Sequence, residues 1–208
     1  RAFELFETAI ILEDDVLAEP TFFPFAEEML ERYRDDKRVM HITGYCPVLP
    51  MRQPSNYPYS YYFSHYAYIW GWATWRRAWQ PYYDVDMKLW SPLLKNELAK
   101  HPGLSPTILN AYDTMPRGFD TWDYQWSFAR LIQSGLAIVS AKNLIRNIGF
   151  GSMATNTLYA NTRHSFMPVA PQAFPLQHPP FMMPWPSYDP AVYKEGAKEI
   201  AAQEGVAI

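Results

Sequence analysis

Residues 8–15 read TAIILEDD, a continuous apolar run that stops at three consecutive carboxylates. A short apolar run of this kind is typical of a buried strand, and the carboxylates mark the polar rim where the strand ends. In open α/β sheets, ligands bind beyond the carboxyl ends of the strands. This stretch therefore predicts both a buried strand and a ligand site at its end.

The residues that follow predict a strand-helix-strand unit. Residues 22–34 place apolar side chains at helical spacing with charged residues around them, which is typical of an amphipathic helix. Residues 39–43 read VMHIT and end at Gly44, which is typical of a second strand. Because two strands joined through a helix usually run parallel, we expect an α/β fold with a mixed, mainly parallel sheet flanked by helices.

The rest of the chain predicts further elements. Trp72, Trp75 and Trp79 fall at i, i+3 and i+7, which indicates a helix from Trp72 to Pro81. A helix over residues 121–134 is followed by a strand, and a proline-rich stretch wraps the surface after it. The other predicted elements are a strand over 59–64, short helices over 86–94 and 105–112, a strand over 136–140, an extended piece over 143–150 and a terminal helix over 191–204. We expect one domain over 1–164 and a tail over 165–208.

Composition narrows the class of protein. The 208 residues are 49% hydrophobic and 19% charged, which argues against disorder and fits one globular domain. A net charge of −3 without a basic tract argues against a nucleic-acid partner. The lone cysteine, Cys46, cannot form an internal disulfide and is expected to be a buried thiol. Aromatic residues make up 17% of the chain, as in many sugar-handling proteins and also in Trp-rich cores.

Glu13, Asp14 and Asp15 are the strongest candidates for a metal site. Mg²⁺ and Mn²⁺ prefer carboxylate oxygens, keep several waters and often bridge to substrate phosphates, so one or two of these side chains would suffice. A solvated acidic turn before the following helix explains the same three residues, because negative charge suits a helix N-terminus. Both interpretations stay open on spacing alone.

Asp123 is the second candidate, at the start of the helix predicted over 121–134. A carboxylate flanked by Trp122, Tyr124 and Trp126 could take a proton from a hydroxyl nucleophile. Asp in the first turn of a helix is also favourable on dipole grounds alone. His164 and His178 have no spacing signature and are expected to be plain surface residues.

Four segments, in order, resemble a known family. Residues 10–15 (IILEDD) resemble a variant of the Asp-x-Asp metal motif, residues 69–75 (IWGWATW) resemble a Gly-Trp acceptor-side loop, residues 121–126 (TWDYQW) resemble a Trp-Asp catalytic helix, and residues 147–151 (NIGFG) resemble a closing segment. Together they are similar to a glycosyltransferase of the GT-A fold, in the group of bacterial sugar transferases similar to eukaryotic N-acetylglucosaminyltransferase I.

The resemblance implies a role for each matched residue. Asp15 would be the metal ligand for Mn²⁺ or Mg²⁺, and Glu13 and Asp14 would contact hydroxyls of a nucleotide-sugar donor. Asp123 would be the base that deprotonates an acceptor hydroxyl, with inversion at the anomeric carbon. Other residues would line the donor or acceptor sugar: Trp70, Gly71, Trp72 and Trp122. The partners implied are the nucleotide sugar and a glycan or lipid-linked acceptor.

Two departures from the family pattern qualify these expectations. The family usually places about a hundred residues of nucleotide-binding strand and helix before the carboxylate motif, whereas the motif here lies near the start of the chain, so we expect the N-terminal part of the fold to be missing. Asn156 stands where similar transferases often have His, and Asn cannot serve as a charged partner.

Two other functions fit parts of the same pattern. A carbohydrate-binding or scaffolding domain would explain the aromatic excess without catalysis. A metal-dependent phosphoesterase would use the three carboxylates but has no need of an aromatic acceptor wall. With no signal peptide at the start, a cytoplasmic setting with peripheral membrane association is the expectation.

Overall fold

A five-stranded sheet in the order β1-β5-β3-β6-β4 forms the centre of the molecule. The structure, a computed structural model, describes residues 1–46, 57–66, 68–101, 104, 106–115, 121–149 and 167–184. The strands of this sheet are β1 (Thr8–Ile11), β3 (Val39–Thr43), β4 (Tyr61–Ser64), β5 (Trp72–Trp75) and β6 (Leu136–Ser140). Only β3 and β6 pair in parallel within it. The fold is α/β, but the expectation of a mainly parallel sheet is wrong, because the sheet is mixed and mostly antiparallel.

The insertion of β5 explains this difference. The predicted strand-helix-strand unit is present as β1, α2 (Phe22–Arg32) and β3. The two strands run in the same direction, since each is antiparallel to β5. They are not neighbours, however, because β5 lies between them and pairs with both. A strand from later in the chain thus replaces the parallel contact by two antiparallel ones.

The helix predicted from Trp72 is wrong for its first four residues, which form β5 before the short helix α4 (Arg76–Trp79) begins. Trp72 and Trp75 belong to two different buried clusters, one on each face of the sheet. Ile11 pairs with Trp72, and Ala73 pairs with residues of both neighbouring strands. The backbone pairing with β1 and β3 therefore overrides the helical spacing of the tryptophans.

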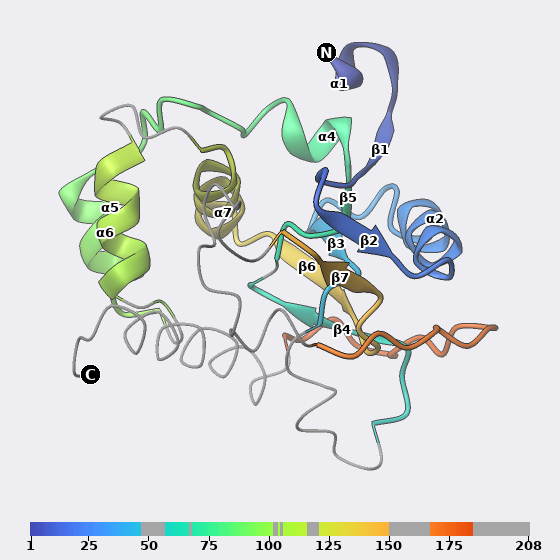
Figure 1. Ribbon diagram of the computed structural model, residues 1–208. Coiled ribbons are helices and arrows are strands. Elements are labelled where there is room, and N and C mark those ends of the chain that lie inside the picture. Colours follow the sequence, from blue (N-terminus) through green and yellow to red (C-terminus); the bar gives the residue numbers. More distant parts are fainter. Residues whose placement is uncertain are drawn as a thin grey trace.

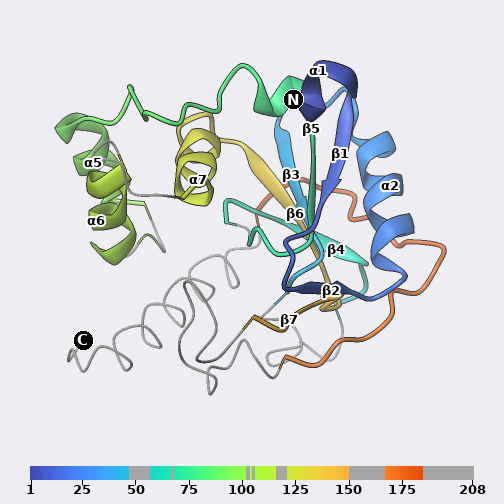
Figure 2. The same ribbon diagram turned by 45° about the horizontal axis from the view of Figure 1, so that its top comes forward.

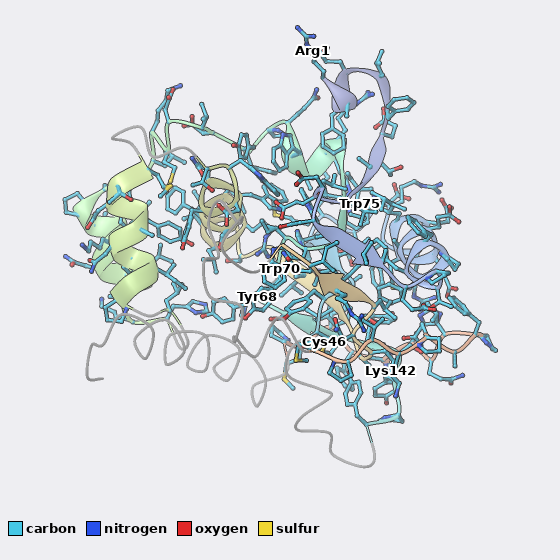
Figure 3. The ribbon with its side chains drawn as sticks, viewed as in Figure 1. Arg1, Cys46, Tyr68, Trp70, Trp75 and Lys142 are labelled. Atoms are coloured by element: carbon cyan, nitrogen blue, oxygen red, sulfur yellow. The ribbon has the colours of Figure 1, made fainter. Side chains whose placement is uncertain are left out.

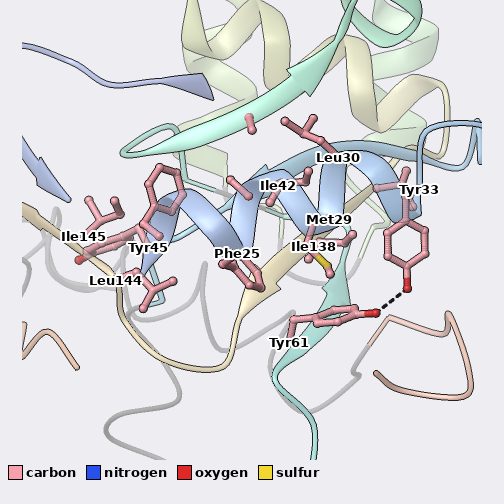
Figure 4. Close-up of a cluster of buried hydrophobic side chains, with 14 of the residues drawn as sticks. Phe25, Met29, Leu30, Tyr33, Ile42, Tyr45, Tyr61, Ile138, Leu144 and Ile145 are labelled. Atoms are coloured by element: carbon pink, nitrogen blue, oxygen red, sulfur yellow. Dashed lines mark hydrogen bonds between the residues drawn. The ribbon is translucent and has the colours of Figure 1, made fainter. Parts of the chain in front are cut away.

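Two helices cover opposite faces of the sheet, α2 on one and α7 (Asp123–Ile132) on the other (Figure 1 and Figure 2). Both agree with the helices predicted over 22–34 and 121–134. Phe25 and Met29 of α2 are fully buried against the sheet (Figure 4). Trp75 reaches from the sheet to the helix, where its indole N–H donates to the carbonyl of Leu30 at 3.0 Å.

A second group of helices packs on the outer side of α7, where Figure 2 shows α5 (Pro92–Leu98) and α6 (Pro106–Thr114). Phe128 and Leu131 of α7 join their buried cluster. The helix predicted over 86–94 starts later than expected, because Ser91 caps α5 by accepting a hydrogen bond from the backbone N–H of Leu94 at 3.4 Å. The helix predicted over 105–112 corresponds to α6. A short helix at the start, α1 (Ala2–Leu5), was not predicted.

A separate two-stranded sheet lies beside the carboxyl end of β1. It consists of β2 (Val16–Ala18) and β7 (Ile145–Asn147), which are antiparallel. The prediction of an extended piece over 143–150 covers β7, whereas β2 was not predicted. Gly71 ties this small sheet to the main one, because it has a φ of +57° and a Cβ there would lie 2.5 Å from Cγ1 of Ile145. Only glycine fits that position.

The described part of the tail, residues 167–184, runs as an extended strap along β4 and α2, as expected for a proline-rich wrapping segment (Figure 1). Met167 and Leu176 are buried in the same cluster as α2. Ser60 holds the strap at the sheet edge, since its backbone N–H donates to Gln177 and its hydroxyl accepts from the Gln177 N–H, both at 2.8 Å. The helix predicted over 191–204 lies outside the described residues.

Two single-residue expectations have clear outcomes. Cys46 is fully buried, as expected. His178 lies in the strap and is not a plain surface residue, because 25% of its side chain is exposed and both ring nitrogens have partners. His164 lies outside the described residues. Among the helices described, none has both the length and the apolar character needed to cross a membrane.

A network of hydrogen-bonded polar side chains connects the strap to the core. Tyr33 and Tyr61 share a hydrogen bond of 2.6 Å between their hydroxyls (Figure 4). The Tyr61 hydroxyl also lies 3.1 Å from Nδ1 of His178, and Nε2 of that ring lies 3.2 Å from the carboxylate of Glu28. Burial raises the pKa of Tyr61, so this hydroxyl stays protonated. This hydrogen-bond network links α2, β4 and the strap.

We therefore expect Tyr61→Phe to destabilise the protein by about 1–3 kcal/mol, because the ring remains while buried Tyr33 and partly buried His178 each lose a hydrogen bond. Urea unfolding followed by far-UV circular dichroism measures the change. Tyr82→Phe, at an exposed tyrosine, is the matched control and should stay within about 0.5 kcal/mol of the wild type. Equal stability of the two variants would contradict the role of the Tyr61 hydroxyl.

Candidate functional site

The two predicted acidic segments meet at one edge of the sheet. Glu13 follows the end of β1, and Asp123 is the first residue of α7. Because α7 turns back through Gly135 into β6, and β6 runs in the same direction as β3 and β1, the start of α7 lies at the edge where β1 ends. The topology thus brings together residues that are far apart in the sequence.

The electrostatics of Glu13 show how close these carboxyl groups are. Burial, which is the largest cause, and the negative charges of Asp15, Asp123 and Asp14, in that order of size, together raise the pKa of Glu13 from 4.5 to about 7. Four carboxyl groups therefore share one region. The charge of Asp123 acts on Glu13 more strongly than that of the adjacent Asp14.

Asp15 is held by the small sheet of β2 and β7. Its carbonyl accepts a hydrogen bond from the backbone N–H of Ile148 at 2.8 Å. Gly149 packs directly on its side chain, where a Cβ would overlap Oδ2 and lie 2.7 Å from Cγ. The Gly149 N–H donates to the side chain of Asn147 at 2.7 Å, which fixes the turn. Within the described residues, Oδ1 of Asp15 is buried and has no hydrogen-bond partner.

These features fit a divalent cation. A cation would satisfy a buried carboxylate oxygen that has no donor, and it would also offset the repulsion among neighbouring carboxylates. No three His, Cys, Asp or Glu side chains form a ligand set in the described ranges. Asp15 alone is still sufficient for Mg²⁺ or Mn²⁺, because such ions keep waters and bind substrate phosphates.

Asp123 has an aromatic environment. The Thr121 hydroxyl donates a hydrogen bond to its carboxylate. Burial raises the pKa of Tyr83 and of Tyr124, and the charge of Asp123 contributes to both shifts, which places these two rings beside it. Tyr124 was part of the predicted surround, whereas Tyr83 was missed because it lies in an irregular segment before α5. Trp126, the other predicted neighbour, is buried in the core.

Trp72 connects the two acidic segments. It pairs with Ile11 at the end of β1, and its ring stacks on that of Trp122 with a centroid distance of 5.5 Å and an interplanar angle of 19°. Trp122 directly precedes Asp123. Because only 2% of Trp72 is exposed, the structure gives it a packing role, and its contact with a sugar stays a prediction.

The remaining predicted site residues, Trp70 and Gly71, make packing contacts. Trp70 packs against Tyr45 and Tyr68, with centroid distances of 4.9 and 6.0 Å, and Figure 3 shows Trp70 and Tyr68 next to each other. Gly71 is buried and has the structural function of admitting Ile145. Residues 150–157, which include the end of the fourth matched segment and Asn156, lie outside the described residues.

The sequence matches no protein-family model and no curated protein. The function is therefore inferred from the chemistry of the carboxylate cluster. One of its contacts had no signal in the sequence, because Tyr83 lies outside any periodic element. Gly149 belongs to the fourth matched segment, but its contact with Asp15 was not predicted.

The raised pKa of Glu13 predicts a pH-dependent loss of stability. Between pH 4.5 and about 7 the folded protein binds a proton at Glu13 that the unfolded chain releases, so stability falls as the pH rises through this window. Glu13→Gln removes that loss. With a chelator present, we expect the variant to match the wild type near pH 4 and to have a higher Tm at pH 8.

Thermal unfolding followed by circular dichroism at pH 4, 6 and 8 measures this difference. Glu27→Gln, at an exposed position on α2, controls for the substitution itself. A difference between Glu13→Gln and the wild type that is the same at all three pH values would show that Glu13 has no raised pKa.

Proposed function

We propose that this chain is a metal-dependent glycosyltransferase, which moves a sugar from a nucleoside diphosphate sugar to an acceptor hydroxyl with inversion. The observation that carries the proposal is the electrostatic contact between Asp123 and the run Glu13 to Asp15. A donor-side carboxylate cluster and a candidate base then face one site. The resemblance of the four sequence segments supports the same function.

Asp15 is the residue that would hold Mn²⁺ or Mg²⁺, through the carboxylate oxygen that has no other partner among the described residues. The cation would neutralise the charge that develops on the departing nucleoside diphosphate. Asp14 is exposed, and Glu13 is half-buried beside it, so both can accept hydrogen bonds from hydroxyls of the donor. Near neutral pH, Glu13 also carries a proton for part of the time and can donate one.

Asp123 would act as the base. Its carboxylate takes the proton of the acceptor hydroxyl while the oxygen of that hydroxyl bonds to the anomeric carbon and the bond from that carbon to the diphosphate oxygen breaks. Thr121 orients the carboxylate through its hydrogen bond. Tyr83, Tyr124 and Trp122 are partly exposed around it and offer aromatic faces for the C–H groups of a sugar ring.

A carbohydrate-binding domain without catalysis is the second candidate, because the same partly exposed rings could hold a glycan. The two functions differ in what the carboxylates do. A binding domain needs neither a cation nor a nucleotide, whereas a transferase needs both.

Substitution of the two key aspartates separates these functions. We expect Asp15→Ala to weaken Mn²⁺-dependent binding of nucleoside diphosphates at least tenfold in isothermal titration, because the cation loses its carboxylate ligand. Asp123→Asn should leave that binding unchanged and lower the rate of sugar transfer by about 10²–10⁴-fold, because the amide cannot accept the proton. Asp35→Asn, with 91% of its side chain exposed, is the control for both measurements.

The outcomes are distinct for each candidate. Glycan binding that is indifferent to Mn²⁺ and to Asp15→Ala, without binding of any nucleotide sugar, would replace the transferase by the binding domain. Release of phosphate from a nucleotide without an acceptor would indicate a phosphoesterase instead.

Gly149 offers an independent test of the cation site. Gly149→Ala places a methyl group on the carboxylate of Asp15, so Asp15 must move or the turn must open. We expect Mn²⁺-dependent nucleotide binding to weaken about as much as in Asp15→Ala. Ile148→Ala, at the exposed neighbouring residue, should bind normally. Normal binding by Gly149→Ala would remove Asp15 from the cation site.

A further inference from the structure

We propose that His41 is a positioning residue, which sets the place of Asp123 relative to the carboxylate run through its contacts with Trp72 and Trp126. This inference rests on the proposed function, because it assigns Asp123 the role of base. His41 contacts Trp72 and Trp126, and nothing in the sequence marked it as a site residue.

His41 is held in one tautomer. Only 1% of it is exposed. The indole N–H of Trp126 donates to Nδ1 at 3.1 Å, so the proton of the neutral ring is on Nε2, which lies 3.1 Å from the carbonyl of Tyr68 and donates to it. Burial lowers the pKa of His41 well below its usual value, and the positive charge of Arg130 on α7 lowers it further. The ring is therefore neutral and has a fixed orientation.

An irregularity in β3 turns His41 towards α7. The register with β6 shifts between Val39 and His41. Met40 belongs to the buried cluster around Trp72, and His41 stacks on the same tryptophan, while Val39 belongs to the cluster on the opposite face. A regular strand would send Met40 and His41 to opposite faces. The shift brings both to the face that α7 covers.

His41 contacts the first turns of α7 by two routes. The direct route is the hydrogen bond from Trp126. The second route is a stack of nearly parallel rings, in which His41 lies on Trp72 at 5.0 Å and 8°, and Trp72 lies on Trp122 at 5.5 Å and 19°. Trp122 precedes Asp123, and Trp126 lies one turn after it. Together the two routes fix both the position and the rotation of this turn.

The same stack is anchored on the donor side. Trp72 pairs with Ile11, two residues before Glu13. A shift of His41 would therefore move Asp123 with α7 while the carboxylate run stays with β1. A misplacement of about 1 Å between reacting groups can lower a rate by about 10²-fold without a change in ground-state binding. This expectation distinguishes positioning from packing alone.

Two substitutions of His41 test the inference. His41→Gln keeps a donor and an acceptor but loses the ring, and His41→Phe keeps a ring but loses both hydrogen bonds. In assays of transfer to an acceptor with saturating Mn²⁺ and nucleotide sugar, we expect kcat to fall about 10- to 100-fold in both variants. The Kd for Mn²⁺ and nucleoside diphosphate, measured by titration, should change by less than about twofold, because Asp15 is held by other elements.

A double variant shows whether His41 acts through Asp123. In the Asp123→Asn background the base is already lost, so His41→Gln should lower the residual rate no further. A residue that only stabilises the fold would lower the rate by the same factor in both backgrounds. His178→Gln is the matched control, since it also removes a histidine with partners on both ring nitrogens, far from the site, and should leave kcat unchanged.

The possible results separate the inference about His41 from the proposed function. Wild-type kcat in His41→Gln and His41→Phe, or an equal loss in the Asp123→Asn background, overturns the inference and leaves the proposed function intact. Absence of transfer by the wild-type protein overturns both. If either His41 variant does not fold, Trp126→Phe serves as the test, because it removes only the indole N–H that donates to Nδ1 of His41. A kcat of Trp126→Phe equal to that of the wild type would then overturn the inference.

Discussion

The antiparallel pairing of β5 with both β1 and β3 is the constraint on which the rest of the structure depends. Successive side chains of this strand point to opposite faces, so Trp75 packs under α2 and Trp72 packs under α7. The side chains of this one strand therefore pack against the helices on both faces of the sheet. It also sets the site, because Trp72 stands between the end of β1 and the first turn of α7. The spacing of the acidic segments is thus a property of the core.

The acidic site contains polar groups that the described residues do not fully satisfy. In the core, both ring nitrogens of His41 have partners, although Nε1 of Trp72 has none within the described residues. At the site, burial and the charges of neighbouring carboxylates raise the pKa of Glu13 to about 7, and one oxygen of Asp15 has no donor among the described residues. Such local conflicts lower stability and are typical of functional sites, because the surrounding structure holds them in place. The rigid stack beside the site supplies that support.

Local patterns predicted the elements whose signal lies in consecutive residues. The apolar run before Glu13 and the amphipathic pattern of α2 both predicted the right kind of element. The expectation that the apolar run forms a buried strand is wrong, because β1 lies at the edge of the sheet and is only partly buried. The prediction was wrong for β5, where a helical spacing of tryptophans is compatible with a strand once β1 and β3 pair with it. It missed β2, whose three residues are extended only because they pair with β7. The acidic candidates were found from motifs, and so was the segment that contains Gly149. The contacts of Gly149 with Asp15 and of His41 with Trp126 could not be predicted, because they join residues distant in the chain.

The strap formed by residues 167–184 has a consequence for the order of folding during synthesis. A chain leaves the ribosome from its N-terminus, so α2 and β4 emerge long before the strap does. Until then the cluster that receives Met167 and Leu176 lacks part of its cover, and the edge of β4 beside Ser60 has no partner from the strap. An uncovered sheet edge can pair with other chains. The last described segment therefore completes the core and covers this edge only after the other described elements have been synthesised.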